Sequence, residues 1–418
     1  MISRTGRHRR LRLIAAAAVV AAVAAPTAAS AASVDRNWWY EKYGVAEVQA
    51  EGWNGAGVKI AVIDAQINDQ LPALADASLT VAPALCNDPA TSTEVNDDSV
   101  HGSTVTAILV GNGEGYGAIR GMAPAADVTF YPVGGNATIC RQLDDDRSPW
   151  AVALSDAVAA GADIVTMSKV TTYASKADIE SVARALASGV IFVAGTPNFE
   201  GQGTLPAAMN GVVSVNAFDT NGDLLANDGV PNVQPEVTVV APGVDVALST
   251  WDREQYGGGS SYATPMVAGI LAVAKQKYPV ATANQLIQSL IHNTGTEDHP
   301  LERDTTGGYG YGPASLRHML AVDPTQYPDE NPLMDKSFGE PTAAQVAQAV
   351  SPTTMPAAPA PSTGAGTGGD AGGIEASDAA PVGWVVGGLG ATVLVGVIVV
   401  IVVVTARRRA EHTRGDSA

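Results

Sequence analysis

The stretch GGGSSYATPMVAG, residues 257–269, places two serines at the predicted start of a helix. The three glycines let the backbone turn sharply and let another group approach closely, and the apolar residues that follow recur at helical spacing. A helix start offers unpaired N–H groups and a partial positive charge, which suit an N-cap and also a hydroxyl nucleophile whose reaction develops an oxyanion. Ser260 or Ser261 fits either role, so their partners must decide.

Asp64 and His101 are the side chains that give such a serine a chemical role. Asp64 ends the apolar run VKIAVID, and His101 lies in HGSTVTAILVG, where a helix is predicted to begin. Taken alone, the aspartate is a common turn residue, and the histidine is an ordinary hydrogen-bonding side chain. Together with a serine, however, an imidazole can take the hydroxyl proton and a carboxylate can fix the imidazole tautomer. The combination predicts a catalytic triad of Asp64, His101 and Ser261.

The elements that position this triad are predicted from alternating strand and helix patterns. Continuous apolar runs indicate buried strands at residues 58–64, 127–133, 163–168, 190–194, 212–217 and 237–242. Helical patterns lie between them, in GSTVTAILVG, WAVALSDAVAAG and ADIESVARALASG, the last two ending at Gly161 and Gly189. This order predicts an α/β fold with a mostly parallel central sheet and helices on both faces. Sites in such sheets form at the carboxyl ends of strands, where Asp64 lies.

Several segments resemble the motifs of the subtilisin-like serine proteases. VIDAQI resembles their Asp motif, HGSTVTAILVG their His motif and GSSYATPMVAG their Ser motif, in the same chain order. GMAPAADV and GYGYGPASL match accompanying family segments. The likeness covers about residues 45–320. It implies a subtilisin-like three-layer fold and a serine endopeptidase that cleaves protein substrates and needs no cofactor, although relatives hold structural calcium at various sites.

The resemblance also assigns residues outside the triad. In the family an Asn after a strand donates to the oxyanion, and GTPNFEG places Asn198 at that position, although an Asn in such a loop is also a common turn residue. The segment that pairs with an extended substrate falls on Ser168 and Lys169. A lysine there either lines a pocket that favours acidic side chains or extends its ammonium into solvent, and the sequence leaves both open.

Three segments depart from the family pattern at positions close to the predicted site. The differing residues are Ala65 and Gln66, where Thr or Ser and then Gly are usual, Pro197 in place of Gly, and Lys169 and Val170 in place of Leu and Gly. They alter the surroundings of the Asp64 carboxylate, the loop before Asn198 and the substrate-pairing segment. These departures motivate an alternative: a catalytically weak or inactive scaffold with a subtilisin fold that stabilises a membrane complex.

Both ends of the chain carry segments typical of membrane targeting. Residues 1–31 combine a basic start, an apolar run and small residues, as a secretory signal peptide does. Residues 382–405 contain no charge and are long enough to cross a bilayer. Three arginines follow directly, which places the tail, residues 406–418, in the cytoplasm. We therefore expect a single-pass cell-membrane protein whose catalytic domain is extracytoplasmic.

Between these ends we expect an N-terminal extension at 32–57, a peptidase domain at 58–325 and a Pro/Ala/Gly-rich linker at 326–380. The signal, the short extension, the linker and the single helix together resemble the mycosins, the membrane-anchored proteases of actinobacterial type VII secretion systems. That resemblance implies exported protein substrates and a type VII secretion membrane complex as partner. It also implies that the aromatic cluster at 38–40 wraps the extension around the domain, although ordinary core packing explains the cluster equally well.

Composition narrows the possible ligands. The chain carries a formal net charge of −18, and loss of its Arg-rich ends leaves a still more acidic part, which argues against nucleic acid. Cys86 and Cys140 are the only cysteines, and in an exported domain we expect them to form a disulfide, since a metal site needs more ligands. The acidic run 144–146 lacks the alternation of a calcium loop. We predict no metal site.

An alternative from another class treats Gly259, Ser261 and Ala263 as a degenerate nucleophile elbow of an α/β-hydrolase. Asp298 or Asp304 and His318 would then complete the triad. That motif requires an apolar strand directly before the serine, and STWDREQYGGG supplies none. A structure with His318 beside Ser261 would favour this alternative.

Overall fold

The computed structural model describes residues 36–135, 140, 146–296 and 299–350 of the 418 residues. The predicted signal peptide, transmembrane helix and cytoplasmic tail lie outside this part. Within it, no helix combines the length and apolar character that crossing a membrane requires.

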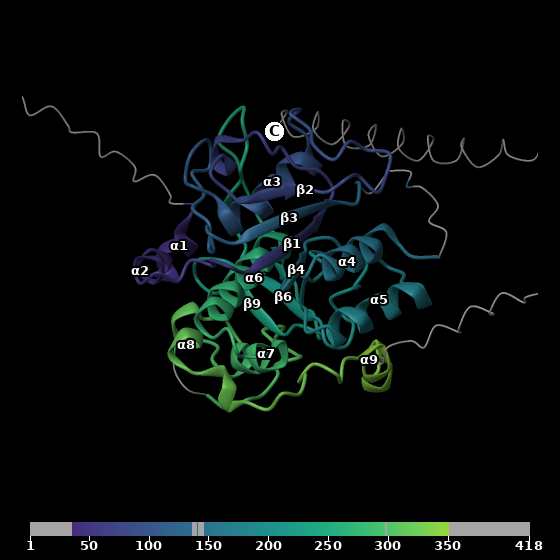
Figure 1. Ribbon diagram of the computed structural model, residues 1–418. Coiled ribbons are helices and arrows are strands. Elements are labelled where there is room, and N and C mark those ends of the chain that lie inside the picture. Colours follow the sequence, from purple (N-terminus) through teal and green to yellow (C-terminus); the bar gives the residue numbers. More distant parts are fainter. Residues whose placement is uncertain (1–35, 136–139, 141–145, 297–298, 351–418) are drawn as a thin grey trace, which may run out of the picture. The chain divides into compact units, whose positions relative to one another are not determined.

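A seven-stranded parallel sheet, in the order β2-β3-β1-β4-β5-β6-β9, forms the centre of the domain (Figure 1). In that order the strands are Leu79–Val81, Asp127–Pro132, Lys59–Asp64, Ile164–Met167, Ile191–Gly195, Val213–Phe218 and Val239–Pro242. Six of them match the predicted apolar runs, because strands covered on both faces need apolar side chains on both. The sequence missed β2, which is short and only half-buried.

Helices cover both faces of the sheet, as the three-layer prediction requires (Figure 1). Successive β1 side chains alternate between two apolar cores: Ile60 and Val62 join one, and Ala61 and Ile63 join the other. The first core contains residues of α3 (Asp97–Val110), α6 (Ser260–Lys277), α7 (Ala283–His292) and α8 (Leu316–Ala321). The second contains residues of α4 (Pro149–Ala159) and α5 (Lys176–Ala187).

The N-terminal extension forms two short helices, α1 (Trp38–Lys42) and α2 (Val45–Ala50). Trp39 and Tyr40 are buried in the first core, so the extension and the domain share one apolar interior. The remaining elements are short: the 3₁₀ turns Pro72–Leu74 and Pro324–Gln326, the hairpin β7 (Ala226–Asn227) with β8 (Val230–Pro231), and the pair β10 (Val246–Ala247) with β11 (Tyr256–Gly257).

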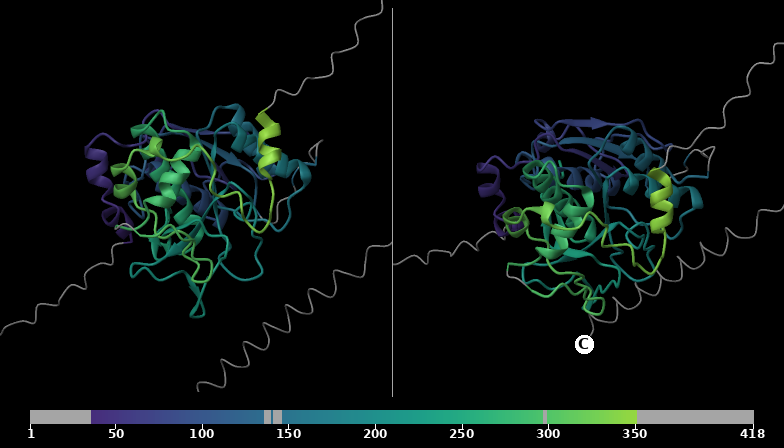
Figure 2. Two further views of the ribbon diagram at one scale, coloured as in Figure 1. Left: turned by 90° about the horizontal axis from the view of Figure 1, so that it is seen from below. Right: turned by 60° about the horizontal axis from the view of Figure 1, so that its bottom comes forward.

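The described part of the predicted linker, residues 326–350, packs on the domain. Leu333 is completely buried and Lys336 is 3% exposed. The carbonyls of Leu333 and Glu340 accept hydrogen bonds from the N–H groups of Gly211 and Asn210. Beyond them, α9 (Ala343–Val350) lies beside α5 (Figure 1 and Figure 2). The folded region therefore extends past residue 325, because a few side chains of a polar, Pro-containing segment find partners far away in the sequence.

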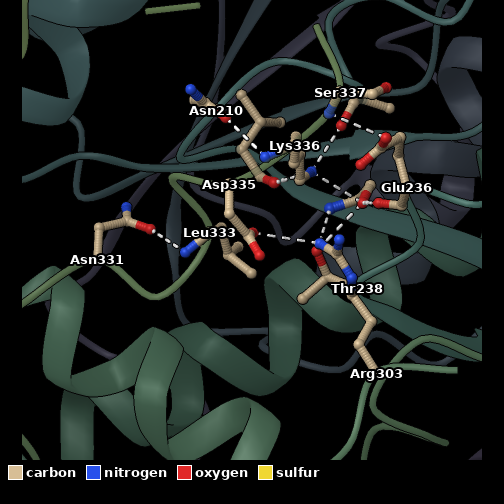
Figure 3. A network of polar contacts seen from close by, with 12 residues as sticks. Asn210, Glu236, Thr238, Arg303, Asn331, Leu333, Asp335, Lys336 and Ser337 are labelled. Atoms are coloured by element: carbon tan, nitrogen blue, oxygen red, sulfur yellow. Dashed lines mark hydrogen bonds and ion pairs between the residues drawn. The ribbon is translucent and has the colours of Figure 1, made fainter. Parts of the chain in front are cut away.

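Lys336 holds this C-terminal segment through three hydrogen bonds (Figure 3). Its ammonium donates to the carbonyls of Ala207 and Val212 at 2.7 and 2.6 Å and to Ser214 Oγ at 3.0 Å. All three acceptors lie just before or within β6. A buried ammonium needs such acceptors, and here they join residues 331–340 to the start of β6 and the segment before it.

Candidate active site

Asp64 and His101 meet at the carboxyl end of β1. The His101 Nδ1 atom lies 3.0 Å from Asp64 Oδ1. The Asp64 side chain is 1% exposed, whereas that of His101 is 25% exposed. The N–H of Ala65 also donates to Asp64 Oδ1, at 2.7 Å. A buried carboxylate thus fixes one imidazole nitrogen and leaves the other for chemistry.

Local sequence explains why α3 can bring His101 to this strand end. Asn96 and Ser99 form a capping box, so α3 begins at Asp97 and not at His101 as the sequence predicted. Gly102 then allows close approach, because a Cβ at this position would lie 2.1 Å from the Gln66 carbonyl oxygen. Only glycine lets α3 pack against the segment that follows β1 without a shift. His101 is thus followed by Gly102, the residue that lets α3 pack closely enough to bring the histidine to the end of β1.

The two serines at the start of α6 have different surroundings, which decides between them. Ser260 is 2% exposed, and its hydroxyl donates to the carbonyl of Thr196. Ser261 is partly exposed, and among the described residues its hydroxyl makes no hydrogen bond. It lines a cavity of about 420 Å³ together with His101. The Ser260 hydroxyl is therefore engaged inside the protein, and Ser261 is the serine whose hydroxyl is available in the cavity.

Pro265 and Ser168 together hold the Ser261 backbone. Proline has no N–H, so the Ser261 carbonyl four residues earlier has no partner within the helix. Ser168 Oγ donates to that carbonyl at 2.8 Å. The bond joins the end of β4 to the first turn of α6, and the predicted substrate-binding residue thus also positions the nucleophile.

Asn198 lines the same cavity with its amide oriented by α6. The N–H of Ser260 donates to Asn198 Oδ1 at 2.8 Å. Because Oδ1 is engaged, the Nδ2 group remains as the free donor, and none of the described residues accepts from it. A side-chain N–H beside a nucleophilic serine is what an oxyanion hole needs.

The loop around Asn198 is held from both sides despite the unusual Pro197. Gln202 Oε1 accepts from the Asn198 N–H at 2.7 Å. The Asn227 and Asn232 side chains donate to the carbonyls of Asn198 and Pro197, each at 2.6 Å. Proline at position 197 costs an N–H but leaves its carbonyl available. The substitution therefore does not remove Asn198 from the cavity.

Comparison with known proteins agrees with this geometry. The Subtilase family model matches residues 55–312. The chain belongs to the Subtilase family. Minor extracellular protease Epr of Bacillus subtilis is 32% identical over 65% of this chain and 40% of Epr. Subtilisin DY of Bacillus licheniformis is 28% identical over 60% of this chain and 88% of its own length.

Solved structures share the fold of this subtilase. MycP1 from Mycobacterium smegmatis is 19% identical with a TM-score of 0.54, and the match covers 72% of this chain and 89% of MycP1. Fervidolysin from Fervidobacterium pennivorans is 24% identical with a TM-score of 0.55, over 68% of this chain and 45% of the other. Both similarities show that this chain has the same fold as these proteins.

Opposing effects set the protonation of the Asp64–His101 pair in this subtilase. Burial raises the pKa of Asp64, but the charge and hydrogen bond of His101, together with the charge of Lys169 and the N–H of Ala65, outweigh burial and hold that pKa below its ordinary value. Burial lowers the pKa of His101, but the charge and hydrogen bond of Asp64 outweigh it and raise that pKa above 6.5. The carboxylate thus stays ionised and makes the imidazole a stronger base.

The departure at Ala65 has a visible consequence. Asp64 Oδ2 is buried, and it accepts no hydrogen bond from the described residues. Ala65, at a position where the family usually has Thr or Ser, has no hydroxyl and offers only its backbone N–H, which donates to Oδ1. A buried carboxylate oxygen without a hydrogen bond carries a desolvation cost. Asp64, the predicted triad acid, is therefore held by fewer hydrogen bonds than its two oxygens can accept.

The structure does not support the hydrolase alternative. His318, in α8, lines a different cavity, with Lys42 and Tyr43. The Asp304 carboxylate accepts from the N–H groups of Thr306 and Gly307 in its own loop. Asp298 lies outside the described residues. The absence of an apolar strand before Ser261 in the sequence had already argued against this alternative.

The cavity includes residues that the sequence analysis did not assign. Asp97, Asp98, Gln202 and Gly203 line it. The first two stand four and three residues before His101, so helical periodicity alone could have placed them on the face of that histidine.

Away from the cavity, Cys86 and Cys140 form a disulfide. Most of the acidic run 144–146 lies outside the described residues. Within them, no cluster of three or more His, Cys, Asp or Glu side chains is arranged to hold a metal ion.

Proposed function

We propose that this subtilase is a serine endopeptidase with Ser261 as nucleophile. The observation that carries the proposal is the hydrogen bond between His101 and the buried Asp64, in a cavity that also exposes the Ser261 hydroxyl and the Asn198 amide. These groups have the types and surroundings that acyl transfer from a peptide requires.

The reaction proceeds in two halves. His101 takes the proton of Ser261 as Oγ attacks the peptide carbonyl, and Asn198 Nδ2 and the Ser261 N–H stabilise the oxyanion. The imidazolium then gives its proton to the leaving amine, the C–N bond breaks, and an acyl-enzyme remains. Water, deprotonated by His101, attacks the ester, and the proton returns to Ser261. Asp64 orients the imidazole and stabilises its cationic form throughout.

A fluorophosphonate probe tests the proposal, because it reacts with an activated serine and needs no knowledge of the substrate. Native protein should be labelled, and Ser261→Ala should abolish labelling. Ser260→Ala is the matched control: it removes the neighbouring hydroxyl, which only bonds Thr196, and should leave labelling intact. Unlabelled native protein, or labelling that survives Ser261→Ala, would contradict the proposal.

We also propose that the enzyme is anchored in the cell membrane, with its peptidase domain outside, and acts on exported proteins as part of a type VII secretion complex. The terminal segments 1–31 and 382–405 and the mycosin-like domain order support this setting. The full chain should remain in membranes after a carbonate wash, and protease added to intact cells should degrade the domain. A chain found in the soluble fraction would overturn the anchoring.

A scaffold that needs no proteolysis is the second candidate function. The unsupported Oδ2 atom of Asp64 favours it, because a weakly supported triad acid would reduce turnover. The experiment is secretion by cells that carry only Ser261→Ala in the full chain. Normal secretion together with loss of substrate processing would establish both roles, whereas loss of secretion would show that proteolysis is the essential one.

A further inference from the structure

Among the described residues, Lys169 is the only lysine or arginine in the lining of the cavity that contains Ser261. It is the second residue after β4, next to Ser168, whose hydroxyl donates to the Ser261 carbonyl. The side chain is half-buried. Its positive charge acts on both Asp64 and His101 and lowers the pKa of each. Lys169 therefore shares the cavity lining with His101 and Ser261.

This ammonium differs from those of the other described lysines in having no partner. Six of the seven described lysines donate a hydrogen bond, form an ion pair or lie over an aromatic ring. Lys169 has no such contact with the described residues. A cation that faces a cavity without a partner offers its donors to whatever enters the cavity.

The opposite charge lies elsewhere on the same cavity. Asp97 and Asp98, in the first turn of α3, contribute carboxylates to its lining. The cavity is thus positive beside Ser168 and negative beside the start of α3. A peptide that crosses it meets attraction for a carboxylate at one place and repulsion at another, so charge determines which substrate residue fits where.

We propose that Lys169 binds the carboxylate of an Asp or Glu in the substrate, close to the scissile bond, and gives this enzyme a preference for acidic sequences. The inference rests on the proposed peptidase function. Of the two roles that the sequence left open for Lys169, the proposal takes the first, because Lys169 lines the cavity. An ammonium that only extends into solvent would make no difference to substrate choice. The acidic chain, with its net charge of −18, repels acidic peptides at long range, so this preference comes from the direct contact.

The test compares peptides that differ in one charge. A fluorogenic peptide cleaved by the purified protein is varied at each position on both sides of the cut, with Glu against Gln and Asp against Asn. At one position the acidic peptide should have a kcat/KM about tenfold above its amide counterpart, as a charge-assisted hydrogen bond provides. Lys169→Gln should bring that ratio to about one, and Lys169→Glu should favour Lys over Glu there.

Two further variants separate the contact from general electrostatics and from folding. Lys176→Glu makes the same change in net charge on α5, where Lys176 is exposed and pairs with Glu180, and it should leave the ratio unchanged. Lys169→Arg retains a positive donor and should retain the acidic preference. If Lys176→Glu lowers the ratio as much as Lys169→Glu does, the proposed contact is wrong.

The outcome is distinguishable from failure of the proposed function. Native protein that no fluorophosphonate labels would refute the peptidase itself. Native protein that is labelled and cleaves peptides, but shows no acidic preference at any position, would refute only the role of Lys169. A preference that survives Lys169→Gln would refute it as well.

Discussion

Asp64 and Lys336 are both ionisable residues buried away from water, but their hydrogen-bond partners differ in kind. Asp64 is 1% exposed and Lys336 is 3% exposed. Asp64 contacts a titratable partner, His101, at the edge of an open cavity. Lys336 contacts two carbonyls and a hydroxyl, none of which titrates. The first arrangement can move a proton, and the second can only join two parts of the chain.

Their pKa values reflect this difference. For Asp64 the effect of burial is outweighed by His101, and the pKa is lowered. For Lys336 burial dominates and lowers the pKa to about 7, since Glu236 and Asp335 act on it without an ion pair to the ammonium (Figure 3). A buried charge beside an opposite, titratable one is thus a better indicator of a site than a shifted pKa by itself.

The largest expected effect is on catalysis. Asp64→Asn should keep the fold but stabilise the wrong imidazole tautomer, so kcat for peptide cleavage should fall by about 10⁴-fold. Asp163→Asn, at the opposite end of the sheet where its carboxylate bonds the Lys59 N–H, is the control and should retain activity. A loss of less than tenfold for Asp64→Asn would show that the buried carboxylate has no catalytic role.

The next effect concerns stability and belongs to Lys336. Lys336→Met keeps the side-chain length but leaves the buried carbonyls of Ala207 and Val212 without the donor that Lys336 provides, which should lower the free energy of unfolding by roughly 2–3 kcal/mol. Fluorophosphonate labelling of the folded variant should persist. Urea unfolding measures the loss, with the exposed Lys176→Met as control. Unchanged stability would mean that the buried ammonium does not hold residues 331–340.

The pH dependence of this stability follows from linkage. The folded protein binds the Lys336 proton with a pKa of about 7, below the value of about 10.4 for an unfolded chain. Between these two pKa values the unfolded state therefore binds more protons than the folded state. The contribution of Lys336 to the free energy of unfolding rises with pH in this range and is lost as pH falls towards 7. The stability difference between native protein and Lys336→Met should widen from pH 7 to pH 9, by at most about 1.4 kcal/mol per pH unit. A constant difference would contradict the assignment.

A smaller effect is expected from restoring support to the triad acid. Ala65→Ser should supply a hydroxyl to Asp64 Oδ2 and raise the free energy of unfolding by about 1 kcal/mol. Ala61→Ser, which adds the same hydroxyl among apolar residues of β1, should destabilise instead. Equal changes in the two urea midpoints would show that Oδ2 gains no hydrogen bond.

The smallest effect is a shift in the pH profile. Lys169 lowers the pKa of His101, so Lys169→Gln should move the acidic limb of kcat/KM to higher pH by a few tenths of a unit for a neutral substrate. An unchanged profile would mean that the lysine charge does not act on the imidazole, and a shift towards lower pH would contradict the direction of its effect.

The sequence by itself determined the parallel sheet and the three triad candidates. Asp64 and Ser261 stand at element boundaries that local periodicity marks. His101 lies inside α3, which begins four residues earlier than the sequence predicted, and it is followed by the glycine that its helix needs. The predicted helix stops, Gly161 and Gly189, likewise lie just past α4 and α5. Local chemistry is sufficient at these positions because each depends on residues only a few places away.

Only the tertiary structure decided which serine is available, how Pro265 and Ser168 hold it, and that residues 326–350 pack on the domain. The contacts responsible are distant in sequence: Ser168 and Ser261 are 93 residues apart, and Lys336 and Ala207 are 129 apart. A carbonyl released by proline and a lysine in a polar segment have many possible partners in the sequence. Once the Ser261 carbonyl and the Lys336 ammonium are buried, only the polar groups packed against them can be their partners. A buried polar atom without a hydrogen bond is too unfavourable to persist.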